Sequence, residues 1–270
     1  MFERPPWSEA CGVTVKVGLS RISVALHGSR GIVAIRTAPT PPPGGKAALG
    51  EFFSSLWPAL SREALPGALV CVVPDLAPDF IEHWKRRFGV VLRPFDLAEA
   101  PFSSEDYAGV LGADRGASLW GAVVRHGHTL GPSFMVADFG THTVTTVLCR
   151  GRILGGTIMP GIGLTMGAVG AGRVLLGQEA TPRGEGFGRE KLRLVAAVGR
   201  GTREGILSGA VLGGVAAVEG LRSRAEKEVG EPLGLILTGG LSPLLARFFS
   251  GDPPVDRQLL HYGATCFLLA

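Results

Sequence analysis

Two short stretches, one in each half of the chain, decide the expected fold: Lys16–Leu26 (KVGLSRISVAL) and Asp138–Leu148 (DFGTHTVTTVL). Each alternates apolar and polar residues around one glycine, which is the pattern of a strand, a tight turn and a second strand. Laid over each other without a gap, they share the glycine and the closing leucine. Two unrelated amphipathic hairpins could match by chance, but the shared glycine favours an internal duplication. We therefore expect an α/β fold of two duplicated halves.

The remaining periodicity completes each half. Strands are predicted at 13–26, 31–36, 69–73, 90–93, from 134 and at 233–237, and helices at 46–60, 79–88 and 203–229. The proline- and glycine-rich stretch 39–45 (PTPPPGG) is interpreted as a linker. We place the domain boundary after residue 128, which gives an N-terminal domain of residues 1–128, with an extension over 1–12, and a C-terminal domain of residues 129–270.

Composition excludes several classes of protein. Hydrophobic residues make up 46% of the 270 residues and charged residues 19%, which excludes a disordered chain. The 41 glycines follow no three-residue period, so the chain is not collagenous. The net charge of +4 comes with no dense basic run and no interleaved aromatic residues, so we expect no nucleic-acid partner. The positive net charge is better explained by an ordinary charge balance or by a pocket for an anionic ligand.

Cysteine usage and the N-terminal sequence indicate the compartment. The four cysteines (Cys11, Cys71, Cys149 and Cys266) lie far apart, and neither they nor the six histidines have metal-ligand spacing. The N-terminal residues 1–12 contain no apolar core of a signal peptide. Glycine, proline or charge interrupts every apolar run before the roughly 18 residues of a membrane span. We therefore expect a cytoplasmic protein without a membrane partner.

The stretch DFGTHT, residues 138–143, is the first candidate for chemistry. Gly140 allows the backbone to turn tightly beside an anion, Thr141 offers a hydroxyl, and Asp138 can hold a phosphate-bound Mg²⁺. Taken alone, a plain hairpin is the more common explanation of such a turn. Two further glycine stretches that follow apolar strands, at 154–161 (LGGTIMPG) and 237–240 (LTGG), favour a ligand crevice.

Two other stretches have a functional and a structural interpretation. In GADR, residues 112–115, Asp114 can act as a general base and Arg115 as an anchor for an anionic or amide substrate. Asp114 can equally be a helix N-cap. In LTGG the paired glycines let a flat ring such as adenine approach the backbone, or form an ordinary turn between a strand and a helix.

In this order the motifs resemble those of the type III pantothenate kinases, members of the actin/hexokinase-like ATPase superfamily. That family carries D-x-G-N-[ST], G-x-D-R, D-x-G-T, L-G-G-x-I-x-P-G and T-G-G. The chain has G-A-D-R, D-F-G-T, L-G-G-T-I-M-P-G and L-T-G-G, together with V-V-P at 72–74 and R-G-T-R-E-G-I-L-S-G at 200–209. The resemblance runs from about Val13 to the C-terminus.

The resemblance implies two ribonuclease H-like halves with a nucleotide cleft between them. It implies transfer of the ATP γ-phosphoryl group to the primary hydroxyl of pantothenate, the first step toward coenzyme A. ATP and Mg²⁺ are the implied cofactors, and the need for a monovalent cation, K⁺ or NH₄⁺, stays open. The implied assembly is a homodimer or a heteromer with a related kinase subunit.

Roles follow residue by residue from the resemblance. Asp114 would accept the proton of the pantothenate hydroxyl, with Gly112 and Arg115 beside it at the substrate. The ATP phosphates and the metal would meet Asp138, Gly140 and Thr141. The adenosine would meet Thr238, Gly239 and Gly240.

The first phosphate motif departs from the family pattern. It reads Lys16-Val17-Gly18-Leu19-Ser20, so Lys16 replaces the family's aspartate and Leu19 replaces its asparagine. Lys16, Gly18 and Ser20 remain candidates for phosphate binding, because an ammonium attracts phosphate directly.

This departure leaves three alternatives. The chain is a kinase, alone or as one subunit of a heteromer; or it is a catalytically silent paralogue that binds ligands or regulates a partner. A sugar or acetate kinase of the same superfamily fits less well, because such chains are usually longer and lack G-x-D-R.

Overall fold

The computed structural model describes residues 10–41, 65–175 and 195–270. The predicted helix at 46–60 and most of the predicted linker lie outside these residues. The chain forms two compact units. Unit 1 takes in the described residues up to Pro101, Gly109–His126 and Gln258–Ala270, and unit 2 takes in Phe102–Ala108 and Gly127–Arg257. The C-terminal segment Gln258–Ala270 thus belongs to unit 1. A single domain boundary after residue 128 would place this segment in the second half.

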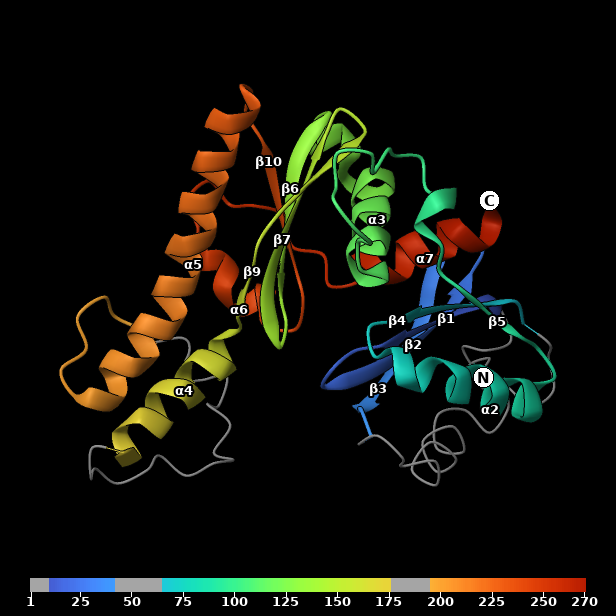
Figure 1. Cartoon of the computed structure of the whole chain (residues 1–270), viewed down its shortest axis with the longest axis horizontal. Coiled ribbons are helices and arrows are strands. Elements are labelled where there is room, and N and C mark those ends of the chain that lie inside the picture. The colour runs from blue at the N-terminus through green and yellow to red at the C-terminus, as the bar shows by residue number, and fades with distance from the viewer. Residues whose placement is uncertain (1–9, 42–64, 176–194) are drawn as a thin grey trace, which may run out of the picture. The chain divides into compact units, whose positions relative to one another are not determined.

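Unit 1 is built on a mixed sheet whose strand order is β3-β2-β1-β4-β5 (Figure 1). β1 (Ala10–Val17), β2 (Arg21–Gly28) and β3 (Gly31–Pro39) are antiparallel neighbours, whereas β4 (Gly67–Cys71) and β5 (Leu92–Pro94) continue the sheet in parallel from β1. The first predicted strand–turn–strand unit is confirmed as β1 and β2.

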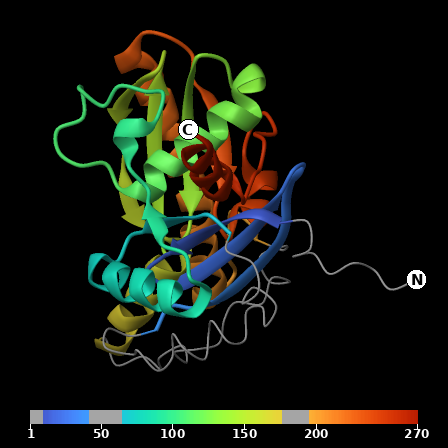
Figure 2. The same cartoon turned by 90° about the vertical axis from the view of Figure 1, so that its right-hand side faces the viewer.

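Helices cover both faces of the unit 1 sheet. Val13, Val15 and Ile22 point to one face and form a core with Phe80 and Trp84 of α2 (Ala77–Phe88). The other face carries α7 (Leu259–Leu269), and the two helices lie on opposite sides of the strands in both views (Figures 1 and 2). The helix predicted from Asp79 begins two residues earlier, because Pro78 favours the first helical turn; Leu76 is its N-cap.

A third helix of unit 1, α3 (Ala113–Leu130), packs closely against α7 and continues into unit 2. A Cβ atom at Gly263 would overlap the carbonyl oxygen of Ala117, and one at Gly121 would overlap that of Leu259. Glycine at both positions therefore sets the distance between the two helices. Short 3-10 turns at Pro74–Leu76 and Leu97–Glu99 complete the unit.

Unit 2 repeats the sheet topology of unit 1. Its strands are β6 (Ser133–Phe139), β7 (His142–Cys149), β8 (Arg152–Gly155), β9 (Ile158–Pro160) and β10 (Gly234–Thr238). β6 pairs antiparallel with β7 and parallel with β10, as β1 does with β2 and β4. β8 and β9 both pair with β7. The duplicated α/β fold is confirmed.

The turns of the two hairpins differ in length. Three residues, Gly18–Ser20, separate β1 from β2, whereas only Gly140 and Thr141 separate β6 from β7. The ungapped overlay of the two stretches is therefore wrong by one residue after the turn. Before the turn it holds, because Lys16 and Asp138 are both the penultimate residues of their strands.

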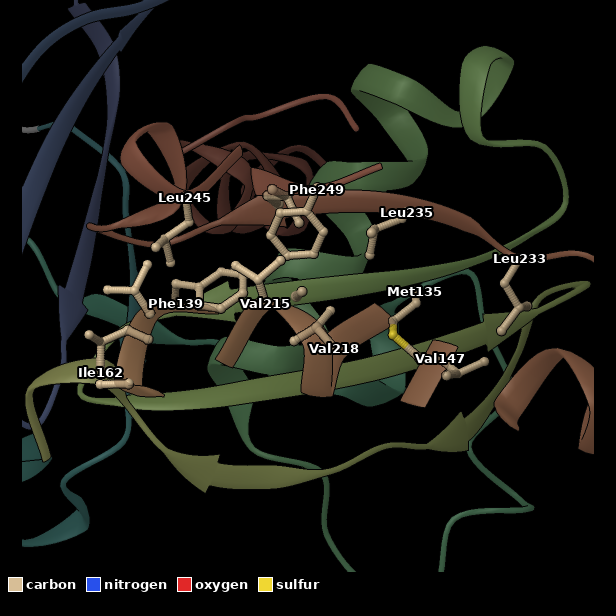
Figure 3. Close-up of a cluster of buried hydrophobic side chains, with 14 residues drawn as sticks. Met135, Phe139, Val147, Ile162, Val215, Val218, Leu233, Leu235, Leu245 and Phe249 are labelled. Carbon is tan, nitrogen blue, oxygen red and sulfur yellow. The ribbon is translucent and has the colours of Figure 1, made fainter. Parts of the chain in front are cut away.

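The core of unit 2 lies between its sheet and α5 (Thr202–Val229). Val215 and Val218 of α5 pack with Met135 and Phe139 of β6 and Leu235 of β10 (Figure 3). Three short helical segments, α4 (Ile162–Leu175), α6 (Ser242–Leu245) and the 3-10 turn Ala246–Phe248, flank this core. By length and composition α5 could cross a membrane, although the interruptions in its sequence had suggested otherwise. Its buried residues, however, are those of a core helix.

Candidate functional site

The D-F-G-T and T-G-G stretches meet at one edge of the unit 2 sheet. Asp138 of β6 and Thr238 of β10 are direct partners in the parallel pairing of these strands. Both strands end there at their carboxyl ends, which is where ligands bind in open α/β sheets. The predicted neighbourhood of Asp138, Gly140 and Thr141 with Thr238, Gly239 and Gly240 is therefore present within unit 2.

The two glycines that follow Thr238, next to Asp138, have different steric surroundings. Gly239 has a φ of +92°, and a Cβ atom there would overlap the Asp138 carboxylate and lie 2.7 Å from the backbone of Phe139. Gly240 differs, because a Cβ atom there would meet nothing within 4 Å. Gly239 is thus required by packing, whereas Gly240 borders open space that a ligand can enter.

A third glycine stretch closes on the same turn. The Gly161 amide donates to the carbonyl oxygen of Thr141 at 3.1 Å. A Cβ atom at Gly161 would lie only 2.5 Å from the carbonyl oxygen of Gly140. The Gly140 amide donates to the carbonyl oxygen of His142 at 3.1 Å, so it closes the turn. We had expected this amide to face an anion. The turn instead offers the Thr141 side chain and the Asp138 carboxylate.

The donor set around Asp138 fits one kind of metal. No group of three or more His, Cys, Asp or Glu side chains capable of holding a metal occurs within the described residues. Mg²⁺ commonly binds through one or two carboxylates, water and substrate phosphates rather than through a complete protein cage. A single carboxylate beside the hydroxyl of Thr238 therefore suits a phosphate-bound Mg²⁺ and does not suit a structural zinc.

The first phosphate motif forms a separate turn in unit 1. The Gly18 amide donates to the carbonyl oxygen of Arg21 at 3.0 Å, and the Thr40 hydroxyl donates to that of Gly18 at 2.6 Å. Lys16 is half-buried, whereas Leu19 and Ser20 are exposed. Thr40 was missed in the sequence, because the following prolines marked its stretch as a linker.

G-A-D-R forms the start of α3 in unit 1. Helix α3 begins at Ala113, so Asp114 lies in its first turn and is not the N-cap. The Asp114 carboxylate accepts the Arg115 amide at 2.9 Å, and Gly112 accepts two helix amides through its carbonyl oxygen. A Cβ atom at Gly112 would lie 2.8 Å from Asp114 Oδ1. The glycine therefore leaves room for the half-buried carboxylate.

The described geometry thus groups the predicted residues into three places: Asp138 with Thr238–Gly240 in unit 2, and the turns around Lys16 and Asp114 in unit 1. A family model described as type III pantothenate kinase matches residues 13–224. The chain belongs to the type III pantothenate kinase family.

Relatives within the type III pantothenate kinase family are about one-third identical to this chain over the residues that match. The Thermomicrobium roseum protein is 34% identical over 205 residues, which are 73% of this chain and 71% of the relative. The Jannaschia sp. protein is 34% identical over 161 residues, 59% of this chain and 57% of the relative. The chain thus spans little more than half the length of some relatives that it matches.

Solved structures show the same fold at low sequence identity. A candidate 2-dehydro-3-deoxygalactonokinase from Sinorhizobium meliloti is 16% identical, with a TM-score of 0.57 over 95% of each chain. The activator of 2-hydroxyisocaproyl-CoA dehydratase from Clostridium difficile, solved with bound ADPNP, is 13% identical. Its TM-score is 0.51, over 96% of this chain and 93% of that one. The chain therefore has the same fold as these two proteins.

Proposed function

We propose that this chain is a pantothenate kinase that transfers the ATP γ-phosphoryl group to the primary hydroxyl of pantothenate, early in coenzyme A synthesis. One observation carries the proposal: the glycine stretches of unit 2 converge around the Asp138 carboxylate at the ends of β6 and β10. Membership of the type III pantothenate kinase family supports the choice of substrate.

The nucleotide side of the proposed site lies in unit 2. The Asp138 carboxylate and the Thr141 side chain face the phosphates from the turn that Gly140 closes. Thr238, Gly239 and Gly240 face the adenosine. Asp138 is the residue that would hold Mg²⁺, whose charge neutralises the phosphate oxygens when it is bound. The open space beside Gly240 allows a flat ring to lie against the backbone.

The acceptor side lies at the start of α3. Asp114 accepts the proton of the pantothenate hydroxyl, because a half-buried carboxylate in the first helical turn can serve as a general base. Arg115 binds the pantothenate carboxylate or amide through its fork of donors, and Gly112 lies beside the substrate and leaves room for the Asp114 carboxylate. Phosphoryl transfer needs mainly positioning and charge neutralisation, which these groups can supply.

Lys16 and Leu19 favour a second candidate function. Loss of a metal-binding acid usually costs orders of magnitude in rate, so the chain alone can be a silent ligand-binding or regulatory paralogue. We propose that it acts as a homodimer or, with slight preference, beside a related kinase subunit that has an intact first motif. A cytoplasmic location and a requirement for K⁺ or NH₄⁺ belong to the same proposal.

A coupled ADP-release assay tests the kinase. The purified chain is given pantothenate, ATP and Mg²⁺, with and without K⁺ or NH₄⁺, and Asp114→Asn serves as the matched control. Pantothenate-dependent ADP release that the variant lacks supports the kinase. ATP and pantothenate binding by calorimetry without turnover favours the silent paralogue. Neither binding nor turnover would refute both.

A further inference from the structure

The two faces of the β1–β2 hairpin in unit 1 differ in chemistry. The face toward α2 is apolar, whereas the face toward α7 carries a cluster of polar side chains that are almost fully buried. Thr14, His27 and His261 are 0%, 2% and 4% exposed. Since each of them is hydrogen-bonded, the cluster is satisfied internally and needs no water.

These side chains form one continuous series of hydrogen bonds, here called the polar relay: Thr265, His27, Thr14, His261 and Ser23. Thr265 Oγ1 lies 2.8 Å from His27 Nδ1, and Thr14 Oγ1 lies 2.7 Å from both His27 Nε2 and His261 Nδ1. Ser23 Oγ lies 2.8 Å from His261 Nε2. The relay therefore runs from α7 through both strands and ends on β2.

One arrangement of the protons in the polar relay follows from its shortest contacts. The Thr265 hydroxyl donates to the carbonyl oxygen of His261 at 2.8 Å, so its oxygen accepts from the His27 ring. His27 Nδ1, at 2.8 Å, lies nearer to this oxygen than Nε2, at 3.1 Å, and we assign the ring proton to Nδ1. In a neutral ring His27 Nε2 then accepts from the Thr14 hydroxyl, whose oxygen accepts from His261 Nδ1–H. His261 Nε2 is left as an acceptor, and Ser23 must donate to it.

Both rings are neutral, as this direction requires. Burial lowers the pKa of His27 to about 4. Burial, followed by the charges of His27 and Lys16, lowers the pKa of His261 to about 3. The polar relay thus keeps one proton arrangement near pH 7.

The relay ends beside the altered phosphate turn. Lys16 and Ser23 are direct partners in the antiparallel pairing of β1 and β2, so their side chains project from the same face as neighbours. Because the Ser23 hydroxyl proton is committed to His261, the remaining lone pairs of Ser23 can only accept. Lys16 has three donors and no acceptor, so the two groups are complementary.

We propose that the polar relay makes Ser23 a fixed acceptor for the Lys16 ammonium and so positions Lys16 to bind a phosphate group at the turn between β1 and β2. The identity of this ligand rests on the proposed kinase function, whereas the Lys16–Ser23 pair does not. Ser23 is a positioning residue. Held by the polar relay, Lys16 would supply part of the positive charge that a metal bound by an aspartate would supply in the first turn.

NMR of the ligand-free, full-length chain tests the relay without reference to activity. At pH 7 the ring ¹⁵N shifts of His27 and His261 should each show a protonated Nδ1 and an unprotonated Nε2. Ser23→Ala should shift the Nζ and Cε signals of Lys16, whereas Ser29→Ala, on the exposed turn of the same sheet, should not. A protonated Nε2 on either ring, or Lys16 signals that do not shift in the Ser23→Ala variant, would overturn the proposal.

A double-mutant cycle on ATP binding tests the functional half. Lys16→Met should weaken ATP binding about 10- to 100-fold and Ser23→Ala about 3- to 10-fold. The double variant should bind no more weakly than Lys16→Met alone, because Ser23 acts through Lys16. Ser23→Thr, which keeps the hydroxyl, should restore binding. Additive losses would overturn the positioning role.

The two proposals fail in different ways. If the unmodified chain does not bind ATP, the kinase function fails, and the NMR result alone decides whether Ser23 positions Lys16. If ATP binds and the cycle is additive, the kinase function stands and the positioning role of Ser23 is refuted.

Discussion

Lowering the pH from 7.5 to 5 should destabilise unit 1 through the two histidines of the polar relay. His27 and His261 have pKa values of about 4 and 3 in the folded chain, against 6.5 for an unperturbed histidine. The unfolded chain therefore binds more protons than the folded chain in this range. The stabilisation is complete above pH 6.5 and is lost as the pH falls toward 4 and then 3.

The size of the effect at pH 5 depends mainly on the unfolded rings. At that pH an unfolded histidine is almost fully protonated, while both folded rings remain neutral. Each ring should remove about 2 kcal/mol from the free energy of unfolding, and the pair about 4 kcal/mol. The charged and titratable neighbours of the two rings are Lys16 on β1 and Tyr262, which lies at the edge of the His27 ring.

Chemical denaturation between pH 7.5 and 5 measures this effect. Tryptophan fluorescence reports on unit 1 alone, because Trp84 and Trp120 are buried there and the sequence of unit 2 contains no tryptophan. Unfolding should take up about two protons near pH 5. His27→Gln and His261→Gln should lower the overall stability, but each should remove half of the pH dependence that these two rings contribute. His83 of α2, whose pKa is also lowered by burial and by the nearby charges of Arg86 and Arg87, contributes separately.

Two results would refute this reasoning. A free energy of unfolding that stays constant between pH 7.5 and 5 would mean that the rings are protonated or exposed in the folded chain. A double His→Gln variant that keeps the full pH dependence would place the titrating groups elsewhere. Glu231, whose pKa is lowered to about 2 by its hydrogen bonds from Arg150, Ser133 and Cys149, acts only below its ordinary pKa of 4.5. It therefore leaves the tested range unaffected.

Four further predictions concern the proposed site. Asp114→Asn should keep ATP binding but lower kcat by about 10²- to 10⁴-fold, and a loss of only a few-fold in a turnover assay would leave Asp114 only a structural role in the first turn of α3. Gly239→Ala should lower the free energy of unfolding by about 2–4 kcal/mol in denaturation, because of its positive φ and the overlap with Asp138. Gly240→Val should fold normally yet weaken ATP binding in calorimetry, and unchanged affinity would exclude the adenosine from this place. Lys16→Asp combined with Leu19→Asn should give the chain Mg²⁺-dependent turnover on its own; a slower variant of an already active chain would instead make Lys16 itself catalytic.

The sheet topology could be predicted because its signals are local. Alternation around Gly18 and Gly140 predicts the two hairpins, and the apolar runs predict the strands parallel to them. The length of the first turn could not be predicted from the overlay. In this turn the carbonyl oxygen of Ser20 accepts the amide of Thr40, twenty residues along the chain, and the overlay of the two stretches carries no sign of this bond.

The candidate nucleotide site in unit 2 was predicted better than the surroundings of Lys16. Each motif of unit 2 carries glycines that its close contacts require, so sequence and packing agree. The residues of the polar relay belong to no such sequence motif. Its histidines, His27 and His261, are separated by more than two hundred residues, and their buried partners are single hydroxyls of Thr14, Ser23 and Thr265. Only the return of α7 to the first sheet brings them together.

That return also has a consequence for synthesis of the chain. Unit 2 is an insertion within unit 1, so β1 and β2 leave the ribosome long before α7 exists to cover them. Exposed apolar strand surfaces in such half-made domains promote aggregation. The face of β1 and β2 that α7 later covers instead presents the hydroxyls of Thr14 and Ser23 and the imidazole of His27, which water solvates well until the helix is made. A buried polar face thus also protects the nascent chain from sticking to its neighbours.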